Sequence, residues 1–328
     1  MRAESNHKRF VTLAPMMEVT DRHFRTFTRL LSNHIINYTE MITCDALLYG
    51  PRERLLEYDA FEQPIAVQLG GSDPDKLSEC AKICEQVGYS EINLNVGCPS
   101  DRVQDGRIGV CLMLEPERVA KCVSKMIKAV QIPITVKTRI GVDNHDDYEF
   151  LRNFIQLQVD AGCKMFIIHA RKAWLKGLSP KKNRTVPPLD YERVHRLVAD
   201  FPDCKFELNG GLNNFDMIQE AIDKVGSAMV GRTFWDNPWL FHNTDSTFYG
   251  ETNPVKSRLE LIDKYIPYME KNIADNISFN RLTPPLLGLY HQVKGSKKWR
   301  QFISEKRQFY DSYFEDLFEL CRELESDL

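Results

Sequence analysis

One cysteine in this chain lies in a setting suited to chemistry. Cys98 belongs to the run from Asn93 to Ser100 (NLNVGCPS), which closes a pattern typical of a buried strand. Gly97 lets the backbone turn where a side chain would clash, and Pro99 biases Cys98 toward an extended conformation. A free cysteine by itself is more often a small buried hydrophobe. Here we expect a rigidly held thiol at a strand's C-terminal end, where α/β enzymes keep their reactive groups.

Two glycine-containing segments predict a phosphate site. Asn209-Gly210-Gly211 and Gly231-Arg232 follow the last two predicted strands. Barrels commonly hold a phosphate at this position, glycines let it approach the backbone, and an arginine adds a charge-assisted donor. The glycine pair by itself is explained equally well by a turn.

Lys137 and His169 end two further predicted strands. Together with the glycine segments, Lys137 suggests a phosphorylated cofactor whose ring is tuned by a cation; a structural ion pair explains the residue alone equally well. A lone histidine after an apolar run is more often a satisfied core residue. A cysteine–histidine hydrolase is the weaker alternative, because no third orienting residue can be named.

Alternating strand and helix patterns position these residues. Eight strand candidates separated mostly by helical stretches match a (β/α)8 barrel, and a doubly wound sheet is the alternative because periodicity alone does not separate the two. Nearly every strand ends in candidate chemistry, which a closed barrel would bring to one mouth. The strands are predicted at 11–15, 36–40, 65–69, 91–95, 134–138, 165–169, 206–209 and 228–230, and the helices at 74–86, 115–130, 148–161, 191–200 and 215–224.

The sequence changes character after the eighth strand. We predict a catalytic TIM-barrel domain over residues 1–243, a linker at about 244–256 and a small helical domain over 257–328. Pro284-Pro285 interrupts the apolar periodicity of the last segment, so at least three helices are expected there.

Composition indicates a soluble globular protein. The chain has 328 residues, 43% hydrophobic residues and a net charge of −3, so a nucleic-acid partner would have to be met by local patches. Apolar runs are too short to span a bilayer, and residues 1–9 have no signal-peptide core. Nine cysteines without a Cys-x-x-Cys pair favour free thiols, a cytoplasmic location and no metal site. A monomer is expected.

The motifs together resemble the tRNA-dihydrouridine synthases, in particular the A-type branch. They match in order and spacing over residues 10–240, and the stretch 170–184 is similar to the A-type signature. Asp105 and Val110 depart from the asparagine and alanine expected there. The matching segments are LAPMMEVTD (13–21), TEM (39–41), QLGG (68–71), LNVGCPS (94–100), VKTRIG (136–141), IHARK (168–172), NGG (209–211) and MVGR (229–232).

The resemblance implies reduction of uridine to dihydrouridine in tRNA, with tightly bound FMN recharged by NADPH. It implies hydride transfer to uracil C6 and a proton from Cys98 to C5; thiols, with an unperturbed pKa of ~8.5, are largely protonated at neutral pH. Asn95 is placed to hold the flipped-out uracil. The A-type branch implies tRNA positions 20 and 20a. FMN contacts carried over are Pro15, Met16, Met17, Gln68, Lys137, His169, Asn209, Gly210, Gly211, Gly231 and Arg232.

Two basic stretches support an RNA partner independently of the resemblance. Residues 171–184 contain six basic residues and no acidic one, and residues 281–307 contain seven basic residues with Glu305 as the only acid. Trp174, Tyr290 and Trp299 are interleaved and would stack on bases. A solvated helix face is the alternative for the second stretch, which the acidic segment 311–327 bounds. Predicted RNA contacts besides Asn95 are Arg139, Arg171, Lys181, Arg184, Lys297 and Arg300.

Three other functions fit parts of the pattern. An FMN-dependent barrel reductase of a small enone or pyrimidine would share the phosphate site and Lys137 but needs no basic helical region. A non-enzymatic RNA-binding protein on a degenerate barrel leaves the candidate site residues without a role. An aldolase-type barrel with Lys137 as Schiff base does not explain Asn95 and Cys98.

Overall fold

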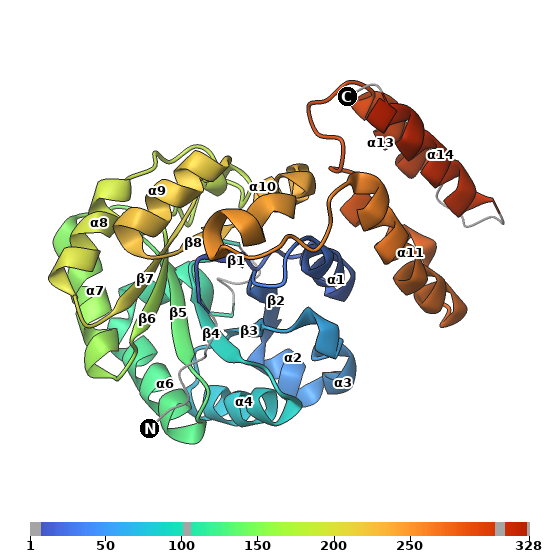
Figure 1. Ribbon diagram of the computed structural model, residues 1–328. Helices are drawn as coiled ribbons and strands as arrows, with labels where there is room; N and C mark the ends of the chain where they lie inside the picture. The colour runs from blue at the N-terminus through green and yellow to red at the C-terminus, as the bar shows by residue number, and fades with distance from the viewer. Residues whose placement is uncertain (1–7, 101–105, 306–311, 327–328) are drawn as a thin grey trace.

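A closed parallel barrel forms the centre of the molecule (Figure 1). The computed structural model describes residues 8–100, 106–305 and 312–326. Its eight strands pair in the order β1-β8-β7-β6-β5-β4-β3-β2. The ring closes because the Leu13 N–H donates to the Ile36 carbonyl at 2.9 Å, beside a parallel bridge between Thr12 and Ile36. The strands are β1 Val11–Leu13, β2 Asn37–Thr43, β3 Ile65–Gly70, β4 Glu91–Val96, β5 Ile134–Arg139, β6 Met165–His169, β7 Lys205–Asn209 and β8 Ala228–Val230.

This closure confirms the predicted TIM barrel over the doubly wound sheet. The strands are buried along nearly their whole length, as expected where helices cover a parallel sheet. Several strand ends differ by one or two residues from those expected; β1, for example, ends at Leu13. The largest difference is in β2, which was expected to end at Glu40 but continues to Thr43, with an irregular register between Tyr38 and Met41. The irregularity lies at Thr39 and Glu40 and shifts the residue-by-residue pairing of β2 with β3. The alternation of polar and apolar residues does not reveal such a shift.

Helices and short helical turns surround the barrel (Figure 1). Local signals explain their ends; Asp73, for example, caps α4 by accepting from the Asp75 and Lys76 amides, and Gly88 ends that helix in a left-handed conformation. The elements of the barrel region are α1 Arg22–Leu31, α2 Cys44–Tyr49, α3 Arg52–Leu55, η1 Ala60–Glu62, α4 Pro74–Val87, η2 Gly109–Leu114, α6 Pro116–Ala129, α7 Tyr148–Asp160, η3 Lys182–Arg184, α8 Tyr191–Asp200, α9 Phe215–Val225, α10 Arg232–Asp236, η4 Pro238–Asn243 and η5 Asp245–Tyr249.

A separate group of helices follows the barrel and lies against α1 (Figure 1). Its apolar core is distinct from the barrel core, yet it includes Phe27 and Leu31 of α1. Helix α1 therefore presents one face to each core. None of the described helices is both long and apolar enough to cross a membrane. The C-terminal elements are α11 Arg258–Ala274, α12 Phe279–Leu282, η6 Pro284–Leu286, α13 Ser296–Glu305 and α14 Tyr313–Ser326.

The segment predicted as a linker, residues 244–256, is partly ordered against the barrel. Its π-helical turn η5 places the Asp245 carboxylate on the Ser32 hydroxyl and, at 2.8 Å, on the Asn33 amide. The Tyr249 hydroxyl accepts from the Val11 amide at 3.2 Å. Val255, at the other end, is buried in the C-terminal core. The polar composition that suggested a linker instead serves these anchoring contacts.

Candidate active site

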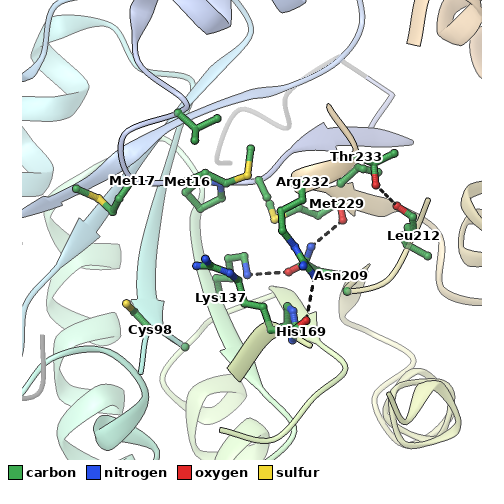
Figure 2. A pocket seen from close by; sticks show the side chains of 18 of the residues that line it. Met16, Met17, Cys98, Lys137, His169, Asn209, Leu212, Met229, Arg232 and Thr233 are labelled. Carbon is green, nitrogen blue, oxygen red and sulfur yellow. Dashed lines mark hydrogen bonds between the residues drawn. The ribbon is translucent and has the colours of Figure 1, made fainter. Parts of the chain in front are cut away.

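The carboxyl ends of the strands surround a pocket of about 490 Å³ (Figure 2). Figure 2 shows Cys98 and Met17 on one side of it, with Arg232 and Thr233 across from them. The barrel thus brings together groups that are far apart in sequence. The sequence-predicted residues that line the pocket are Pro15, Met16, Met17, Gln68, Asn95, Cys98, Lys137, Arg139, His169, Arg184, Asn209, Gly210, Gly211, Gly231 and Arg232.

The loop that carries Cys98 is held from three directions. The Gly97 and Cys98 amides both donate to Asn95 Oδ1 at 3.1 Å. Arg139 Nε donates to the Gly97 carbonyl at 2.9 Å, and the Cys98 carbonyl accepts from the Val110 amide at 3.0 Å. These bonds use backbone atoms of Gly97 and Cys98, so within the described part of the chain the loop is held without the half-buried thiol.

Two of the residues in this loop region had been flagged as departures from the family pattern. Val110, where alanine was expected, is fully buried and supplies the amide bonded to the Cys98 carbonyl. Asp105 lies outside the described residues. A backbone contact such as that of Val110 does not depend on the side chain, so the departure leaves the anchor intact.

Lys137 is a half-buried lysine of β5 that lines the pocket. Its Nζ donates to Asn209 Oδ1 at 2.9 Å, and Asn209 Nδ2 donates in turn to the Met229 carbonyl at 2.8 Å (Figure 2). Burial, reinforced by the nearby positive charge of Arg139, lowers the pKa of Lys137 to about 7. The Asn209 amide that accepts from Lys137 carries no charge. A bound anionic group would therefore raise the pKa of Lys137 and favour its protonated form.

His169 presents a buried, unsatisfied ring atom. Among the described residues, its Nδ1 has no hydrogen-bond partner although it is inaccessible to solvent. Burial, followed by the positive charge of Arg139, holds the pKa of His169 well below its usual range, so the imidazole is neutral. An atom that is inaccessible to solvent does not face the cavity, so His169 lines the pocket through the rest of its neutral ring, which a bound ligand can contact.

The end of β7 requires glycine. Gly210 and Gly211 have φ angles of 110° and 76°, a region that other residues rarely adopt. A Cβ on Gly211 would also lie 2.5 Å from Leu189 Cδ1 and 2.9 Å from the Tyr191 hydroxyl. The backbone here is consequently bare, as an approaching phosphate needs.

Positive charge is concentrated at this mouth. Burial, with the charge of Arg232 as the next contribution, lowers the pKa of both Arg171 and Arg184. Burial also lowers the pKa of Arg139 to about 10. Cations crowded in this way bind anions favourably, because each anionic group relieves their mutual repulsion.

The structure also shows that Arg139 has a role that sequence reasoning missed. Its guanidinium is buried and donates to the backbone carbonyls of Gly97, Lys172 and Asn183. Arg139 was predicted as an RNA contact, and it does line the pocket. Its three backbone hydrogen bonds also connect the Cys98 loop to the basic stretch 171–184.

Other predicted RNA contacts lie outside the pocket lining. Lys181 is exposed, and Arg171 is half-buried with its guanidinium on the Pro187 carbonyl. Lys297 and Arg300 are exposed on α13, in the C-terminal helices. The structure therefore divides the predicted contacts between the barrel mouth and a second surface.

The predicted stacking role of two aromatic residues is wrong. Trp299 and Tyr290 are buried in the C-terminal core, and Trp299 Nε1 donates to the Leu286 carbonyl at 2.7 Å. The Trp299 ring is fully buried and cannot reach a base, whereas Lys297 and Arg300 on the same helix are exposed. Trp174 differs: it is half-buried, and the Lys172 ammonium lies 4.3 Å from the centre of its ring.

Several pocket residues carry no sequence signal for function. Thr233 Oγ1 donates to the Leu212 carbonyl at 2.7 Å and so ties α10 to the loop after β7. Trp235 and Asn213 also line the cavity. In the sequence, only their closeness to Gly210-Gly211 and Gly231-Arg232 could have suggested that Asn213, Thr233 and Trp235 line the pocket. Within the described ranges, histidine, cysteine, aspartate and glutamate form no group of three or more that could hold a metal ion.

The fold and the pocket define a (β/α)8-barrel enzyme with a site for an anionic ligand beside a positioned thiol. Comparison with protein families makes this specific. Residues 12–319 match the family model described as "Dihydrouridine synthase (Dus)". The chain belongs to the dihydrouridine synthase family, as its motifs predicted.

Curated relatives are similar over most of their length. A protein of Synechocystis sp. is 51% identical over 90% of this chain and 88% of its own. Proteins of Shewanella oneidensis and Pasteurella multocida are each 48% identical, covering 92% and 90% of this chain and 89% and 90% of their own. All three are named tRNA-dihydrouridine(20/20a) synthase.

Solved structures share the fold at low sequence identity. A 2-naphthoyl-CoA reductase complex aligns with a TM-score of 0.55 at 10% identity, covering 71% of this chain and 49% of that one. An old yellow enzyme homologue from Zymomonas mobilis aligns with a TM-score of 0.51 at 11% identity, covering 77% of this chain and 91% of that one. At these identities the likeness shows the barrel fold alone.

Proposed function

We propose that this protein reduces uridine to dihydrouridine in tRNA, with FMN as its bound cofactor and NADPH as the electron donor. The observation that carries the proposal is the Cys98 thiol, held by its backbone at the mouth of a pocket built for an anionic ligand. Membership of the dihydrouridine synthase family supports it, as does the name tRNA-dihydrouridine(20/20a) synthase on the relatives. Those names support positions 20 and 20a as the target uridines.

The residues present fit FMN. A cavity of about 490 Å³ is within the usual range for a cofactor of this size. The bare backbone at Gly210 and Gly211, with Gly231 and Arg232, would hold the phosphate. The neutral imidazole of His169 and the amide of Gln68, with Pro15, Met16 and Met17, would contact the ring and its ribityl chain. Lys137 would place a cation beside the pyrimidine edge.

When bound and reduced by NADPH, FMN would supply the hydride that adds to C6 of the uracil ring. Cys98 then donates its thiol proton to C5, so that one hydride and one proton add across the C5=C6 bond. Asn95 Oδ1 is engaged by the Gly97 and Cys98 amides, and one amide N–H goes to Gln68. Asn95 therefore has one amide N–H left with which to hold the edge of the uracil.

The tRNA would meet two surfaces. The uridine must leave the RNA stack to enter the pocket, and the basic stretch around Lys181 and Arg184 borders the pocket entrance. We propose that the barrel, residues 1–243, takes the base and that the helices of residues 257–328 grip the tRNA body through α13. The α13 surface would act mainly on phosphates, because Trp299 is buried and cannot stack on a base.

A spectrum and one assay test the function. We expect purified protein to be yellow and, with NADPH and tRNA lacking dihydrouridine, to convert uridine at positions 20 and 20a, as measured by mass spectrometry of the digested tRNA. Yellow protein inert on tRNA but active on free uracil or an enone would establish a small-molecule reductase instead. Colourless protein that takes up no FMN would contradict the proposal and favour an RNA-binding protein.

Removing charge from α13 should weaken tRNA binding without loss of FMN. For Lys297→Ala with Arg300→Ala we expect weaker binding at low salt and a shallower dependence of log K on log salt. Each lost phosphate contact lowers that slope by ~0.7–0.9, and the two-contact variant should lose about twice this. Filter binding or fluorescence anisotropy over a salt series measures it.

Lys298→Ala is the matched control for this variant. Lys298 is on the same helix and equally exposed, but its ammonium lies 2.5 Å from Glu323 of α14 and is already neutralised. Its removal should barely change the slope. Unchanged tRNA affinity for the double variant at both low and high salt would contradict a role for α13 in gripping RNA.

A further inference from the structure

A continuous chain of buried hydrogen bonds runs through the barrel from its floor to the Cys98 loop. At the floor, Arg9 Nη1 lies 2.5 Å from Glu91 Oε2, and Thr135 Oγ1 donates to Glu91 Oε1 at 2.8 Å. Asn93 Nδ2 donates to Thr135 Oγ1, also at 2.8 Å. The first half of the chain therefore links an ion pair at the amino-terminal end of the strands to the middle of the barrel.

The second half reaches the loop. Gln68 Nε2 donates to Asn93 Oδ1 at 2.8 Å, and Asn95 Nδ2 donates to Gln68 Oε1 at 2.7 Å. Asn95 Oδ1 then accepts from the Gly97 and Cys98 amides. Glu91, Asn93 and Asn95 alternate along β4, while β3 and β5 supply Gln68 and Thr135, so neighbouring strands build the chain together.

Every bond in this chain points the same way. The Glu91 carboxylate, when ionised, can only accept, so the Thr135 hydroxyl must donate to it and accept from Asn93. Because Asn93 donates its Nδ2 to Thr135, its Oδ1 faces Gln68 and accepts from Gln68 Nε2. Gln68 Oε1 consequently faces Asn95 and accepts from Asn95 Nδ2. Asn95 Oδ1 is thereby left facing the loop. A single charge at the floor thus fixes the orientation of three side-chain amides.

The orientation matters because the alternative is repulsive. A flipped Asn95 would present its NH2 group to two backbone N–H groups and leave both buried donors unpaired. The middle of the chain is buried: Asn93 is fully buried, and Thr135 and Gln68 are each 1% exposed. Aligned bonds in such a low-dielectric setting strengthen one another.

We propose that Thr135 and Asn93 are positioning residues for the reaction, acting through Gln68 and Asn95 to hold the Cys98 backbone so that its thiol faces the pocket. Neither residue lines the pocket, and neither contacts Cys98 directly. The role in the reaction rests on the proposed function, but the geometric claim about the loop does not. This separation allows the two to be tested apart.

The test is Thr135→Val, which keeps the shape of the side chain and removes the hydroxyl. We expect amide hydrogen exchange at Gly97 and Cys98 to become about tenfold faster, measured by mass spectrometry of the peptide that contains them. With FMN-saturated enzyme reduced by NADPH, the rate of tRNA reduction should fall about tenfold, equivalent to about 1.4 kcal/mol. The KM for tRNA should stay within twofold, because the RNA-binding surfaces are untouched.

Two further variants make the result specific. Thr135→Ser retains the hydroxyl and should restore both readouts to near the wild-type level. Thr12→Val removes an equally buried threonine hydroxyl inside the same barrel. This hydroxyl donates to Glu207, which meets the chain only at its charged end through Arg9 and supplies none of the bonds from Thr135 to the loop. It should leave exchange at the loop and the tRNA step unchanged.

Equal effects of Thr135→Val and Thr12→Val, or no change in loop exchange for Thr135→Val, would overturn the proposal. Asn93→Leu interrupts the same chain and should reproduce the Thr135→Val pattern. If both of these variants fail to fold while Thr12→Val folds, the chain supports stability and the positioning role is wrong. The exchange measurement needs neither FMN nor tRNA. Failure of the wild type to make dihydrouridine would therefore contradict the proposed function but not the claim that Thr135 and Asn93 hold the Cys98 loop.

Discussion

Replacing Cys98 with alanine should lower the rate of uridine reduction by about 10²–10⁴-fold, the range typical of a lost general acid. The structure makes this substitution unusually clean. Both hydrogen bonds of Cys98 that hold its loop, to Asn95 and to Val110, use backbone atoms that alanine retains. The expected defect is therefore loss of the proton donor with the loop still in place.

A split between the two half-reactions measures the effect. Stopped-flow reduction of the enzyme by NADPH should proceed at the wild-type rate in Cys98→Ala, because the thiol donates no proton in that step. Mixing the NADPH-reduced variant with tRNA should show the full defect. FMN content, read from the visible spectrum, should equal that of the wild type.

Cys111→Ala is the control for nonspecific loss of a thiol. Cys111 is half-buried like Cys98, but its Sγ lies 3.2 Å from the Ile108 carbonyl in η2, and it does not line the pocket. Its removal should leave both half-reactions within about twofold of wild type. A Cys98→Ala enzyme that reduces tRNA uridine at the wild-type rate would remove Cys98 from the mechanism.

The candidate site was predictable because its chemistry is local in sequence. Parallel strands place their carboxyl ends together, so reactive residues found after strand patterns can be assigned to one mouth without knowing any distance. Lys137, His169 and the pair Gly210-Gly211 follow this rule and line one cavity. The β2 boundary was less predictable, because the irregular pairing after Tyr38 depends on β3.

Contacts between distant segments were not predictable from the sequence. The basic stretch 281–307 suggested stacking aromatics, but burial of Trp299 depends on which face of α13 meets the C-terminal core. The chain from Arg9 to Cys98 is equally hidden, because it alternates among three strands whose order is known only once the barrel closes. The sequence shows which polar residues lie inside strands, but it does not show which of their side chains are hydrogen-bonded to each other.

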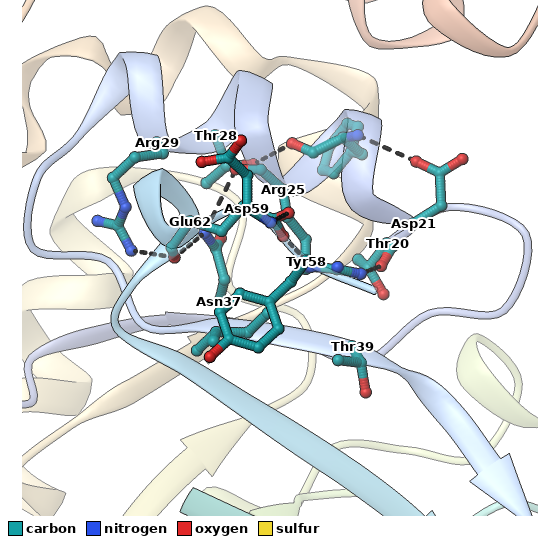
Figure 3. Close-up of polar contacts among 12 residues, drawn as sticks. Thr20, Asp21, Arg25, Thr28, Arg29, Asn37, Thr39, Tyr58, Asp59 and Glu62 are labelled. Carbon is teal, nitrogen blue, oxygen red and sulfur yellow. Dashed lines mark hydrogen bonds and ion pairs between the residues drawn. The ribbon is translucent and has the colours of Figure 1, made fainter. Parts of the chain in front are cut away.

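The same difficulty hides the residues that fasten α1 to the barrel (Figure 3). Arg25 and Arg29 reach from α1 toward η1. Arg25 Nε lies 2.6 Å from Glu62 Oε2, and Arg29 donates to the Glu62 and Ile35 carbonyls. The opposite face of α1 carries Phe27 of the C-terminal core. The Arg25–Glu62 ion pair thus holds α1, the helix that packs against both the barrel core and the C-terminal core.

Replacing Glu62 with alanine should destabilise the protein by about 3–5 kcal/mol. Both side chains are almost fully buried, at 5% exposure for Arg25 and 1% for Glu62, so the variant leaves an unpaired guanidinium away from water. The variant also removes the contact at 2.8 Å between Glu62 Oε1 and the Asp59 amide. Urea unfolding followed by circular dichroism, with the slope against urea compared for each variant, measures the loss.

Two comparisons separate the buried pair from a general effect of removing a carboxylate. Glu57→Ala breaks the pair with Arg22 on the same helix, but Glu57 is 49% exposed, and the loss should stay below about 1 kcal/mol. Arg25→Met combined with Glu62→Leu removes both charges and should be more stable than Glu62→Ala alone, because the cost of the single variant comes mainly from the stranded charge. A double variant no more stable than Glu62→Ala would show instead that α1 depends on the other bonds of Arg25, to the Thr20 and Glu57 carbonyls.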